Sequence, residues 1–392
     1  MADMRSFPDG FLWGTATAAH QIEGGNTNND WWAWEHRPDS ICAEPSGDAC
    51  DSFTRWREDL AIVAGLGLGA YRFSLEWSRI EPAQGEFSEV ALRHYRQQLE
   101  AALAMGIEPV VTFHHFTTPS WLAAQGGFEH PDTPARFAEF CARATERLGD
   151  VLSMACTINE PNVVALAGYR MGAFPPGVAD RGRYEVVTER FCEAHRQAQS
   201  AIKAGPGSFP VGMTLSMTEF VAAPGGEERM VSIRALHEDV YLDATSGDDF
   251  LGVQCYSREL VDANGLVKPT AEQRTTQMGY EFWPGCVEHT VKRAAAWTGN
   301  PIYVTENGIG TEDDAERIEY LAEAISGAHQ CIADGVDLRG YFCWSLLDNF
   351  EWVYGYRPKF GLVEVNRSTF ERTPKASAQF FASVAKANAL SR

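Results

Sequence analysis

Long apolar runs are missing from this sequence of 392 residues. No stretch approaches the roughly 18 consecutive apolar residues that a membrane-spanning helix needs. Residues 1–10 also lack the apolar core that a secretion signal requires. We therefore expect a cytoplasmic protein that does not engage a membrane.

Basic residues are scarce as well. The 33 Lys and Arg stand against 53 Asp and Glu, so the formal net charge is −20. Proteins that bind nucleic acid neutralise phosphates with clusters of Lys and Arg, which this sequence lacks. Nucleic acid is therefore not expected as a partner, and the acidic balance is expected to favour solubility.

Paired cysteine motifs are absent. The nine cysteines are odd in number and include no Cys-x-x-Cys, so we expect reduced thiols in the core and neither a disulfide framework nor a zinc site. The adjacent His114 and His115 would point to opposite faces of a strand, so they cannot share one metal ion. No metal and no cofactor is expected.

Linkers, low-complexity tracts and solenoid repeats are also missing, so we expect residues 1–392 to form a single domain. Strand-like and helix-like segments alternate eight times, and helical spacing is clear at 88–105 and 137–148. This pattern predicts an α/β protein with a single (β/α)8 TIM barrel, whose active site lies at the C-terminal ends of the strands. The expected strands cover residues 11–18, 70–77, 108–116, 153–159, 211–220, 250–256, 302–306 and 338–346.

Two glutamates stand at the ends of these strands. Glu160 follows the fourth strand and Glu306 ends the seventh, so they should face each other across the barrel mouth. Glycoside hydrolysis needs one carboxylic acid to protonate the leaving oxygen and one carboxylate that faces the anomeric carbon. On these residues alone, a solvated loop position or an ion pair is an alternative for each.

Six segments, in this order, resemble the signatures of glycoside hydrolase family 1, the β-glucosidase family. They are residues 11–24, 71–80, Asn-Glu-Pro at 159–161, Thr-Glu-Asn-Gly at 305–308, 340–352 and 359–362. The resemblance implies a retaining β-glucosidase that hydrolyses terminal non-reducing β-D-glucosyl residues through a covalent glycosyl-enzyme. Small-molecule β-glycosides or short oligosaccharides are the implied substrates, and the two carboxyl groups should lie about 5–5.5 Å apart.

The resemblance also implies a role for each catalytic residue. Glu306 is the implied nucleophile, and Arg72 and the Tyr256 hydroxyl are expected to keep it ionised. Glu160 is the implied acid/base, whose pKa the charge of Glu306 should raise. Gln254 and Cys255 depart from the Asn and Tyr that usually precede Tyr256.

A further set matches the positions that hold the sugar in this family. Its members are Gln21, His115, Asn159, Tyr256, Trp344, Glu351 and Trp352, with Arg72 and Phe360 in supporting positions. An ionised Glu351 can accept hydrogen bonds from two hydroxyls at once. On composition alone, Trp344 and Trp352 would more often be core aromatics.

On the leaving-group side, residues 116–118 and Ala155 depart from the family pattern, and the chain is short for the family. We therefore expect an open mouth whose aglycone site is lined by some of five tryptophans. These are Trp31, Trp32, Trp34, Trp121 and Trp283.

Two alternative functions remain open. A 6-phospho-β-glycosidase of the same family would need a cationic pocket, for which Arg357 and Lys359 are candidates, but its relatives carry Ser in place of Glu351. A non-catalytic sugar-binding pseudoenzyme typically loses a carboxylate, whereas Glu160 and Glu306 are both present.

Overall fold

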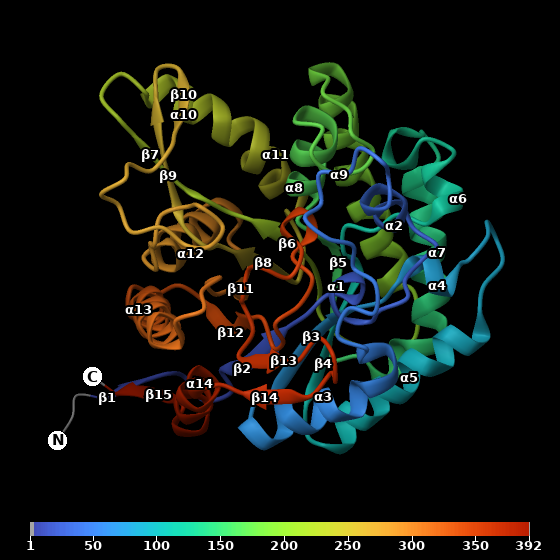
Figure 1. Cartoon of the computed structure of the whole chain (residues 1–392), viewed down its shortest axis with the longest axis horizontal. Coiled ribbons are helices and arrows are strands. Elements are labelled where there is room, and N and C mark those ends of the chain that lie inside the picture. The colour runs from blue at the N-terminus through green and yellow to red at the C-terminus, as the bar shows by residue number, and fades with distance from the viewer. Residues whose placement is uncertain (1–3, 392) are drawn as a thin grey trace.

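The computed structural model of the chain describes residues 4–391 and has a closed barrel of eight parallel strands at its centre (Figure 1). The strands follow one another around the barrel in chain order, and β12 pairs with β2 to close it. They are β2 (Leu12–Ala16), β3 (Ala70–Ser74), β4 (Glu108–His114), β5 (Met154–Asn159), β6 (Val211–Ser216), β8 (Phe250–Gln254), β11 (Ile302–Asn307) and β12 (Leu338–Trp344). Each of the eight expected segments supplies one barrel strand, which confirms the (β/α)8 fold.

Several strands end earlier than the sequence pattern predicts. Strand β3 stops before residue 77 because Glu76 caps a short helix by accepting a hydrogen bond from the Ser78 amide. The prediction of one strand over 211–220 is wrong, since β6 ends at Ser216 and a separate strand, β7 (Glu219–Ala222), follows. Between them the Thr218 amide donates to Glu238, so the barrel pairing does not continue.

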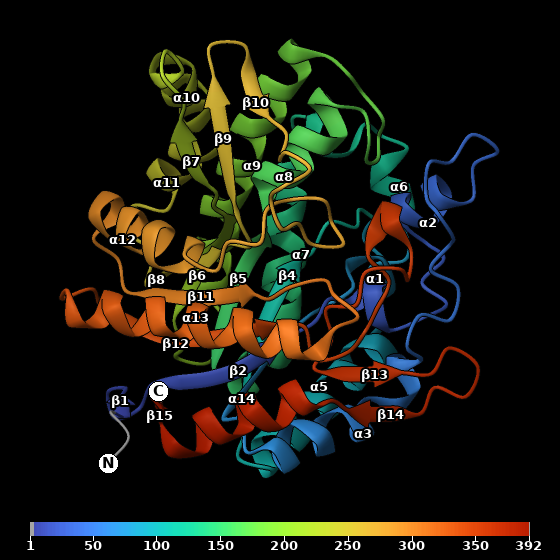
Figure 2. The ribbon, with the colours of Figure 1, turned by 60° about the vertical axis from the view of Figure 1, so that its left-hand side comes forward.

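A small sheet outside the barrel was not expected from the sequence. Strand β7 pairs with β9 (Arg258–Asp262), which forms a hairpin with β10 (Gly265–Val267). The hairpin projects beyond the barrel beside α10 (Glu227–Arg234) in Figure 2. Gly226 lies against the Val261 carbonyl, where any side chain would overlap that oxygen, so glycine permits this close packing.

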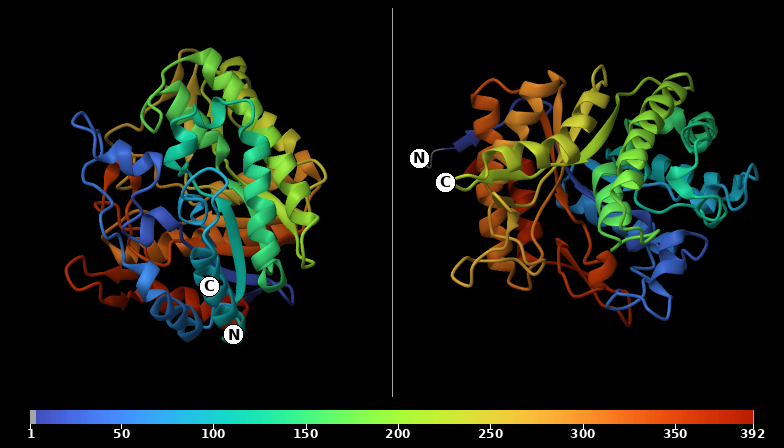
Figure 3. Two further views of the ribbon diagram at one scale, coloured as in Figure 1. Left: turned by 90° about the vertical axis from the view of Figure 1, so that its right-hand side faces the viewer. Right: turned by 90° about the horizontal axis from the view of Figure 1, so that it is seen from above.

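Helices cover the outside of the barrel (Figure 3). The long ones are α3 (Ser52–Leu66), α5 (Glu89–Ala104), α7 (Thr133–Leu148), α9 (Arg181–Lys203), α12 (Cys286–Thr298), α13 (Asp314–Ala333) and α14 (Ala376–Ala387). Short turns follow several strands: α1 (Ala19–Ile22), α2 (Asp30–Glu35), α4 (Trp77–Ile80), α6 (Ser120–Ala123), α8 (Pro161–Ala165) and α11 (Val240–Ala244). Helix α5 illustrates the local cause: Ser88 caps it, and Leu92, Tyr95 and Leu99 form its buried face. None of the described helices combines the length and apolar character needed to cross a bilayer.

The two ends of the described chain meet. Strand β1 (Met4–Ser6) pairs with β15 (Ala389–Ser391), and Figure 1 shows both termini at this edge of the molecule. The Trp13 indole donates to the Asn388 side chain at 2.9 Å, which ties the start of the barrel to the end of the chain. A further pair, β13 (Val363–Val365) with β14 (Arg372–Pro374), lies between β12 and α14 in the chain.

The barrel interior is packed rather than hollow. Ala70, Val110, Met154, Phe250 and Phe342 come from five different strands and form one buried cluster. A much larger apolar cluster includes side chains from both the strands and the helices around them. Because side chains fill the interior, a ligand can enter only at the mouth, where the strands end.

Candidate active site

A cavity of about 240 Å³ opens at the carboxyl ends of the barrel strands. Its walls come from many strand ends, and they carry three carboxyl groups but no Lys or Arg. The lining residues are Gln21, His115, Phe116, Glu160, Val163, Phe174, Ser216, Tyr256, Met278, Tyr280, Glu306, Trp344, Glu351, Trp352, Val353, Tyr354 and Phe360. Both glutamates identified in the sequence therefore face one cavity, together with Glu351.

Glu160 directly follows β5 and precedes Pro161, the first residue of α8. A proline disfavours the right-handed helical conformation in the residue before it, and Glu160 is instead left-handed, with φ of 42°. Among residues 4–391, seven residues other than glycine have φ in this region, and three of them, Glu160, Phe116 and Trp352, line the cavity. Backbone strain is thus concentrated at the cavity, as is typical of functional sites.

Glu306 is held on both carboxylate oxygens. Arg72 in β3 donates to Oε1 at 2.6 Å, Gln254 donates to Oε1 at 3.0 Å, and the Tyr256 hydroxyl donates to Oε2 at 2.6 Å. The Arg72 side chain is fully buried, so its charge acts on Glu306 with little screening by solvent. These three contacts fix the position and orientation of the carboxylate.

The three carboxyl groups of the cavity differ in their pKa values. Burial and the charge of Glu306 raise the pKa of Glu160 well above its ordinary value. Burial also raises the pKa of Glu306, but Arg72, Tyr256 and Gln254 lower it. Glu306 is therefore the first of this pair to ionise, and Glu160 retains its proton. Burial and the charge of Glu306 raise the pKa of Glu351 to about 8.

Asn159 and His115 lie beside this group. The Asn159 Oδ1 accepts from Arg72 and Gln254 at 2.6 and 2.9 Å, so its Nδ2 must be the atom that faces His115 Nε2 at 3.2 Å. His115 Nε2 therefore accepts, and its Nδ1 carries the hydrogen. That Nδ1 is buried and has no hydrogen-bond partner among the described residues. Asn159 itself is fully buried and is not part of the cavity wall.

Gln21 and Glu351 meet in another part of the wall. The Gln21 Nε2 donates to the Phe350 carbonyl at 2.8 Å and to Glu351 Oε2 at 3.3 Å. This leaves Gln21 Oε1 buried without a partner in the described chain. The wall thus offers an unpartnered donor at His115 and an unpartnered acceptor at Gln21, and buried polar atoms of this kind are normally hydrogen-bonded.

Aromatic rings complete this part of the wall. His115 lies nearly parallel to Trp344 and Trp352, with ring centroids 6.0 and 6.3 Å away. Phe360 meets Tyr256 edge to face at 6.0 Å. Gly308 abuts the Trp344 carbonyl so closely that no side chain would fit there, which keeps the end of β12 next to Glu306 in β11.

The expectation that some of the five tryptophans line an aglycone site is wrong. None of Trp31, Trp32, Trp34, Trp121 and Trp283 is part of the cavity wall. Trp31 is buried behind Trp352, and Trp283 donates to Glu219 beneath the Arg258 side chain. The apolar and aromatic residues that do line the cavity include Phe116, Phe174, Met278, Tyr280 and Tyr354. Trp31 and Trp34 are buried in the apolar core, Trp32 stacks on His36, and Trp121 packs edge to face against Trp77.

Gln254 and Tyr280 are among the wall or near-wall residues that were missed from the sequence. Gln254 contacts both Glu306 and Asn159, and its spacing of two from Tyr256 near a strand end was a usable signal for a shared face. Tyr280 lines the cavity from a long loop without hydrophobic periodicity, so no sequence pattern indicates its position. Its pKa is raised well above the ordinary value by burial and by Glu351.

His114 and His115 do point in opposite directions. His115 lines the cavity, whereas His114 packs against Phe128 and Phe137 on the outside of the barrel.

The sequence profile described as Glycosyl hydrolase family 1 matches residues 3–246 and 259–390. The interval 247–258, which holds Gln254 and Tyr256, lies outside this match, so the contacts of these two residues rest on the structure alone.

Known proteins resemble the chain over its whole length. It is 33% identical to Beta-glucosidase A of Thermotoga maritima over 443 aligned positions, which cover 99% of each protein. The crystal structure of beta-glycosidase BGL167 matches with a TM-score of 0.91 and 44% identity over 97% of both chains. The beta-glycosidase from Pyrococcus horikoshii matches with a TM-score of 0.94 and 33% identity, covering 100% of this chain and 97% of that one.

Proposed function

Because this chain belongs to glycosyl hydrolase family 1, we propose that it is a retaining β-glucosidase in which residues 1–392 act as one catalytic domain. The observation that carries the proposal is the contrast between two carboxyl groups in one cavity. Glu306 is hydrogen-bonded by Arg72, Gln254 and Tyr256, whereas the raised pKa of Glu160 favours its protonated form. Glycoside hydrolysis by double displacement needs one group in each state.

In the first step, Glu306 attacks the anomeric carbon while Glu160 gives its proton to the leaving oxygen. The glycosidic C–O bond breaks, and an ester forms between the sugar and Glu306. In the second step, Glu160, now ionised, takes a proton from water as that water attacks the anomeric carbon. The ester bond breaks, the sugar leaves with its original β-configuration, and both glutamates regain their starting states.

The remaining wall residues are proposed to hold the sugar. The unpartnered His115 Nδ1 hydrogen and Gln21 Oε1 supply one donor and one acceptor for hydroxyl groups. Glu351 adds a carboxyl group, and Trp344 and Trp352 supply the apolar faces on which a sugar ring packs. Asn159 reaches a hydroxyl only through the second hydrogen of its Nδ2, because its Oδ1 already accepts from Arg72 and Gln254. A bound sugar would therefore satisfy polar atoms that the protein leaves unpaired.

The aglycone is proposed to lie against a second group of apolar and aromatic lining residues, Phe116, Phe174, Met278, Tyr280 and Tyr354. Aromatic side chains offer a large apolar surface to a flat or apolar leaving group. We therefore expect aryl β-glucosides to be good substrates.

Hydrolysis should proceed with retention, so the first sugar released from p-nitrophenyl β-glucoside should be the β-anomer. Proton NMR spectra recorded early in the reaction distinguish the anomers before mutarotation mixes them. An α-anomer released first would show a single displacement and would remove Glu306 from the role of nucleophile.

The pH profile of kcat/KM should be bell-shaped, with its alkaline limb set by loss of the Glu160 proton. Glu351 contributes to the raised pKa of Glu160, so Glu351→Gln removes a neighbouring negative charge and should move this limb to lower pH. Glu238→Gln serves as a matched control, because Glu238 is buried and paired with Arg293 but does not line the cavity. An alkaline limb that stays in place in Glu351→Gln would contradict the electrostatic coupling.

Unphosphorylated β-glucosides should be preferred to their 6-phosphates by about 100-fold or more in kcat/KM, because like charges confined together cost several kcal/mol. The cavity has three carboxyl groups and no Lys or Arg in its wall. Arg357 lies instead over the Tyr354 ring, and Lys359 is not a wall residue. The preference should increase as pH rises through about 8, where Glu351 ionises.

Paired kinetics on p-nitrophenyl β-glucoside and its 6-phosphate measure this preference. Glu351→Gln is the control, since it keeps the shape of the side chain but removes its charge. It should reduce the ratio of kcat/KM for the glucoside to kcat/KM for its 6-phosphate. Equal or faster turnover of the phosphate by the unmodified enzyme would favour the 6-phospho-β-glycosidase instead.

A further inference from the structure

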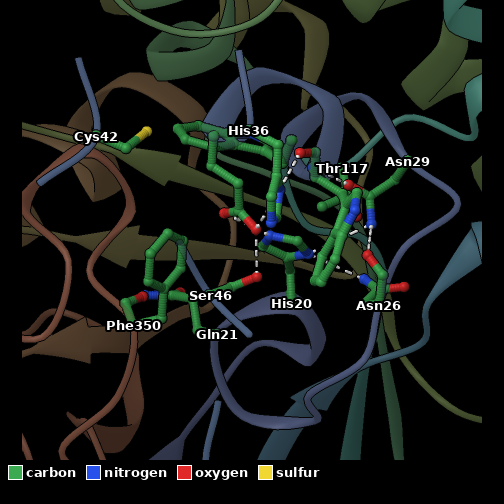
Figure 4. Close-up of polar contacts among 12 residues, drawn as sticks. His20, Gln21, Asn26, Asn29, His36, Cys42, Ser46, Thr117 and Phe350 are labelled. Atoms are coloured by element: carbon green, nitrogen blue, oxygen red, sulfur yellow. Dashed lines mark hydrogen bonds and ion pairs between the residues drawn. The ribbon is translucent and has the colours of Figure 1, made fainter. Parts of the chain in front are cut away.

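His20 is a buried histidine next to the cavity that the proposed reaction does not use. It lies on α1, a single four-residue turn after the first barrel strand, and its side chain is fully buried. The residue before this turn makes no side-chain cap, and the Ala19 amide instead donates to the Ser74 hydroxyl at 2.7 Å. Figure 4 shows the His20 ring between Asn26 and Asn29 on one side and Ser46 on the other.

The hydrogen bonds of the two asparagines define which ring nitrogen of His20 carries hydrogen. Asn26 Nδ2 donates to the Glu76 carboxylate at 2.7 Å, and Asn29 Oδ1 accepts from the Trp32 amide at 2.8 Å, so the orientation of both amides is fixed. Both Nδ2 atoms then face His20 Nδ1, at 3.0 and 3.3 Å. A hydrogen on Nδ1 would oppose two donors. His20 Nδ1 therefore accepts, and the hydrogen lies on Nε2.

The Nε2 atom points to a second buried side chain. It lies 3.5 Å from Glu35 Oε2, within ion-pair distance, and neither atom has a hydrogen-bond partner among the described residues. The other Glu35 oxygen accepts from the Ser46 hydroxyl. His20 thus has a donor-rich side toward Asn26 and Asn29 and an acceptor toward Glu35, which permits only one ring orientation.

The fixed ring supports two parts of the cavity wall. It stacks on the Trp352 ring with an interplanar angle of 8° and centroids 5.7 Å apart. Trp352 has a left-handed backbone with φ of 52°, a strained conformation that persists only where the surroundings hold it. The next residue along α1 is Gln21, whose Nε2 hydrogen bonds reach Phe350 and Glu351.

We propose that His20, fixed in its Nε2–H tautomer by Asn26, Asn29 and Glu35, is a positioning residue that holds Trp352 and Gln21 in place for binding the sugar. The inference rests on the proposed function, because it assigns these two wall residues to sugar binding. It adds a residue that acts through others and does not itself touch the substrate.

His20→Phe tests the proposal, since phenylalanine keeps a ring against Trp352 but leaves Asn26, Asn29 and Glu35 without their partner. We expect KM for p-nitrophenyl β-glucoside to rise about tenfold while kcat changes less than about threefold, as when ground-state binding is lost. His114→Phe is the matched control: His114 is equally buried and lies on a strand, but it faces away from the cavity and should leave both constants unchanged.

Glu35→Gln keeps an oxygen for the Nε2 hydrogen and should stay within about threefold of the unmodified enzyme, which is the conservative rescue that a positioning role requires. The proposal is overturned if His20→Phe leaves KM unchanged, or if His114→Phe raises KM by the same factor as His20→Phe. If His20→Phe does not fold, as judged by near-UV circular dichroism, Glu35→Leu replaces it. An unchanged KM in Glu35→Leu would then overturn the proposal.

A measurement on the unmodified protein decides the tautomer independently of turnover. Long-range proton–nitrogen NMR spectra of the full chain labelled with ¹⁵N-histidine should show the Nε2–H form for His20, and the Nδ1–H form would overturn the assignment. If the unmodified enzyme hydrolyses no β-glycoside, the proposed function is contradicted. If the unmodified enzyme is active and His20→Phe has the same KM and kcat, only this inference is contradicted.

Discussion

Glu306→Gln should abolish turnover of every β-glucoside, with kcat falling by roughly four orders of magnitude or more. The amide cannot form the ester that double displacement requires, and it also removes the charge that the Arg72 guanidinium faces at 2.6 Å. The loss should not depend on the leaving group, because the missing bond is the one to the anomeric carbon. Steady-state kinetics on dinitrophenyl and p-nitrophenyl glucosides and on cellobiose measure this.

Glu238→Gln is a suitable control for this loss. Glu238 is also buried and paired with an arginine, Arg293, but it accepts from the Thr218 amide outside the cavity and should leave activity intact. Comparing the melting temperatures of both variants separates lost chemistry from lost folding. Residual turnover of Glu306→Gln close to that of the unmodified enzyme would show that another group attacks the sugar.

Glu160→Ala should affect substrates according to their leaving groups. Turnover of cellobiose, whose alkoxide leaving group needs a proton, should fall by about 10²–10⁴-fold, the usual contribution of a general acid. Formation of the glycosyl-enzyme from dinitrophenyl glucoside needs no such proton and should stay within about tenfold of normal. A pre-steady-state burst of dinitrophenol, followed by slow turnover, is the expected signature.

Azide should restore fast turnover of dinitrophenyl glucoside in Glu160→Ala, because an anion enters the space left by the carboxyl group and needs no general base. The product should be β-glucosyl azide, formed by attack on the face opposite Glu306. If only the α-azide forms, the roles of Glu160 and Glu306 are exchanged. If azide has no effect, Glu160 is not the acid/base.

The barrel itself was predictable because its signal is redundant. Most of the eight βα repeats show the same alternation of apolar strand and amphipathic helix, so errors at individual strand ends do not change the fold. The ends are where the prediction failed: Glu76 caps a turn and residues 217–218 leave the barrel. At these points single side-chain hydrogen bonds decide the backbone path, and hydrophobic periodicity does not report them.

A place in the cavity wall was predictable where a residue ends or directly follows a strand in a short motif, as Glu306 and Glu160 do. It was not predictable where a long loop returns to the mouth, as at Tyr280, because no local pattern records which loop residue arrives there. The five tryptophans illustrate the opposite error. Trp31 has the chemistry of a sugar-binding residue, but it is buried behind Trp352. Burial competes with binding for the same aromatic side chains, and only the packed structure decides between them.

The pairing of β12 with β2 determines when, during synthesis of the chain, the barrel can close and the cavity can form. Strand β2 is synthesised long before its partner at 338–344, because the whole set of intervening barrel strands lies between them in the chain. Glu351 and Trp352 follow that partner within a few residues, so the ring of strands and the last wall of the cavity are completed together. A product terminated before residue 338 would have two open sheet edges and no Glu351. Premature termination would therefore yield an inactive fragment that is prone to aggregate through its unpaired strand edges, and not an enzyme with reduced activity.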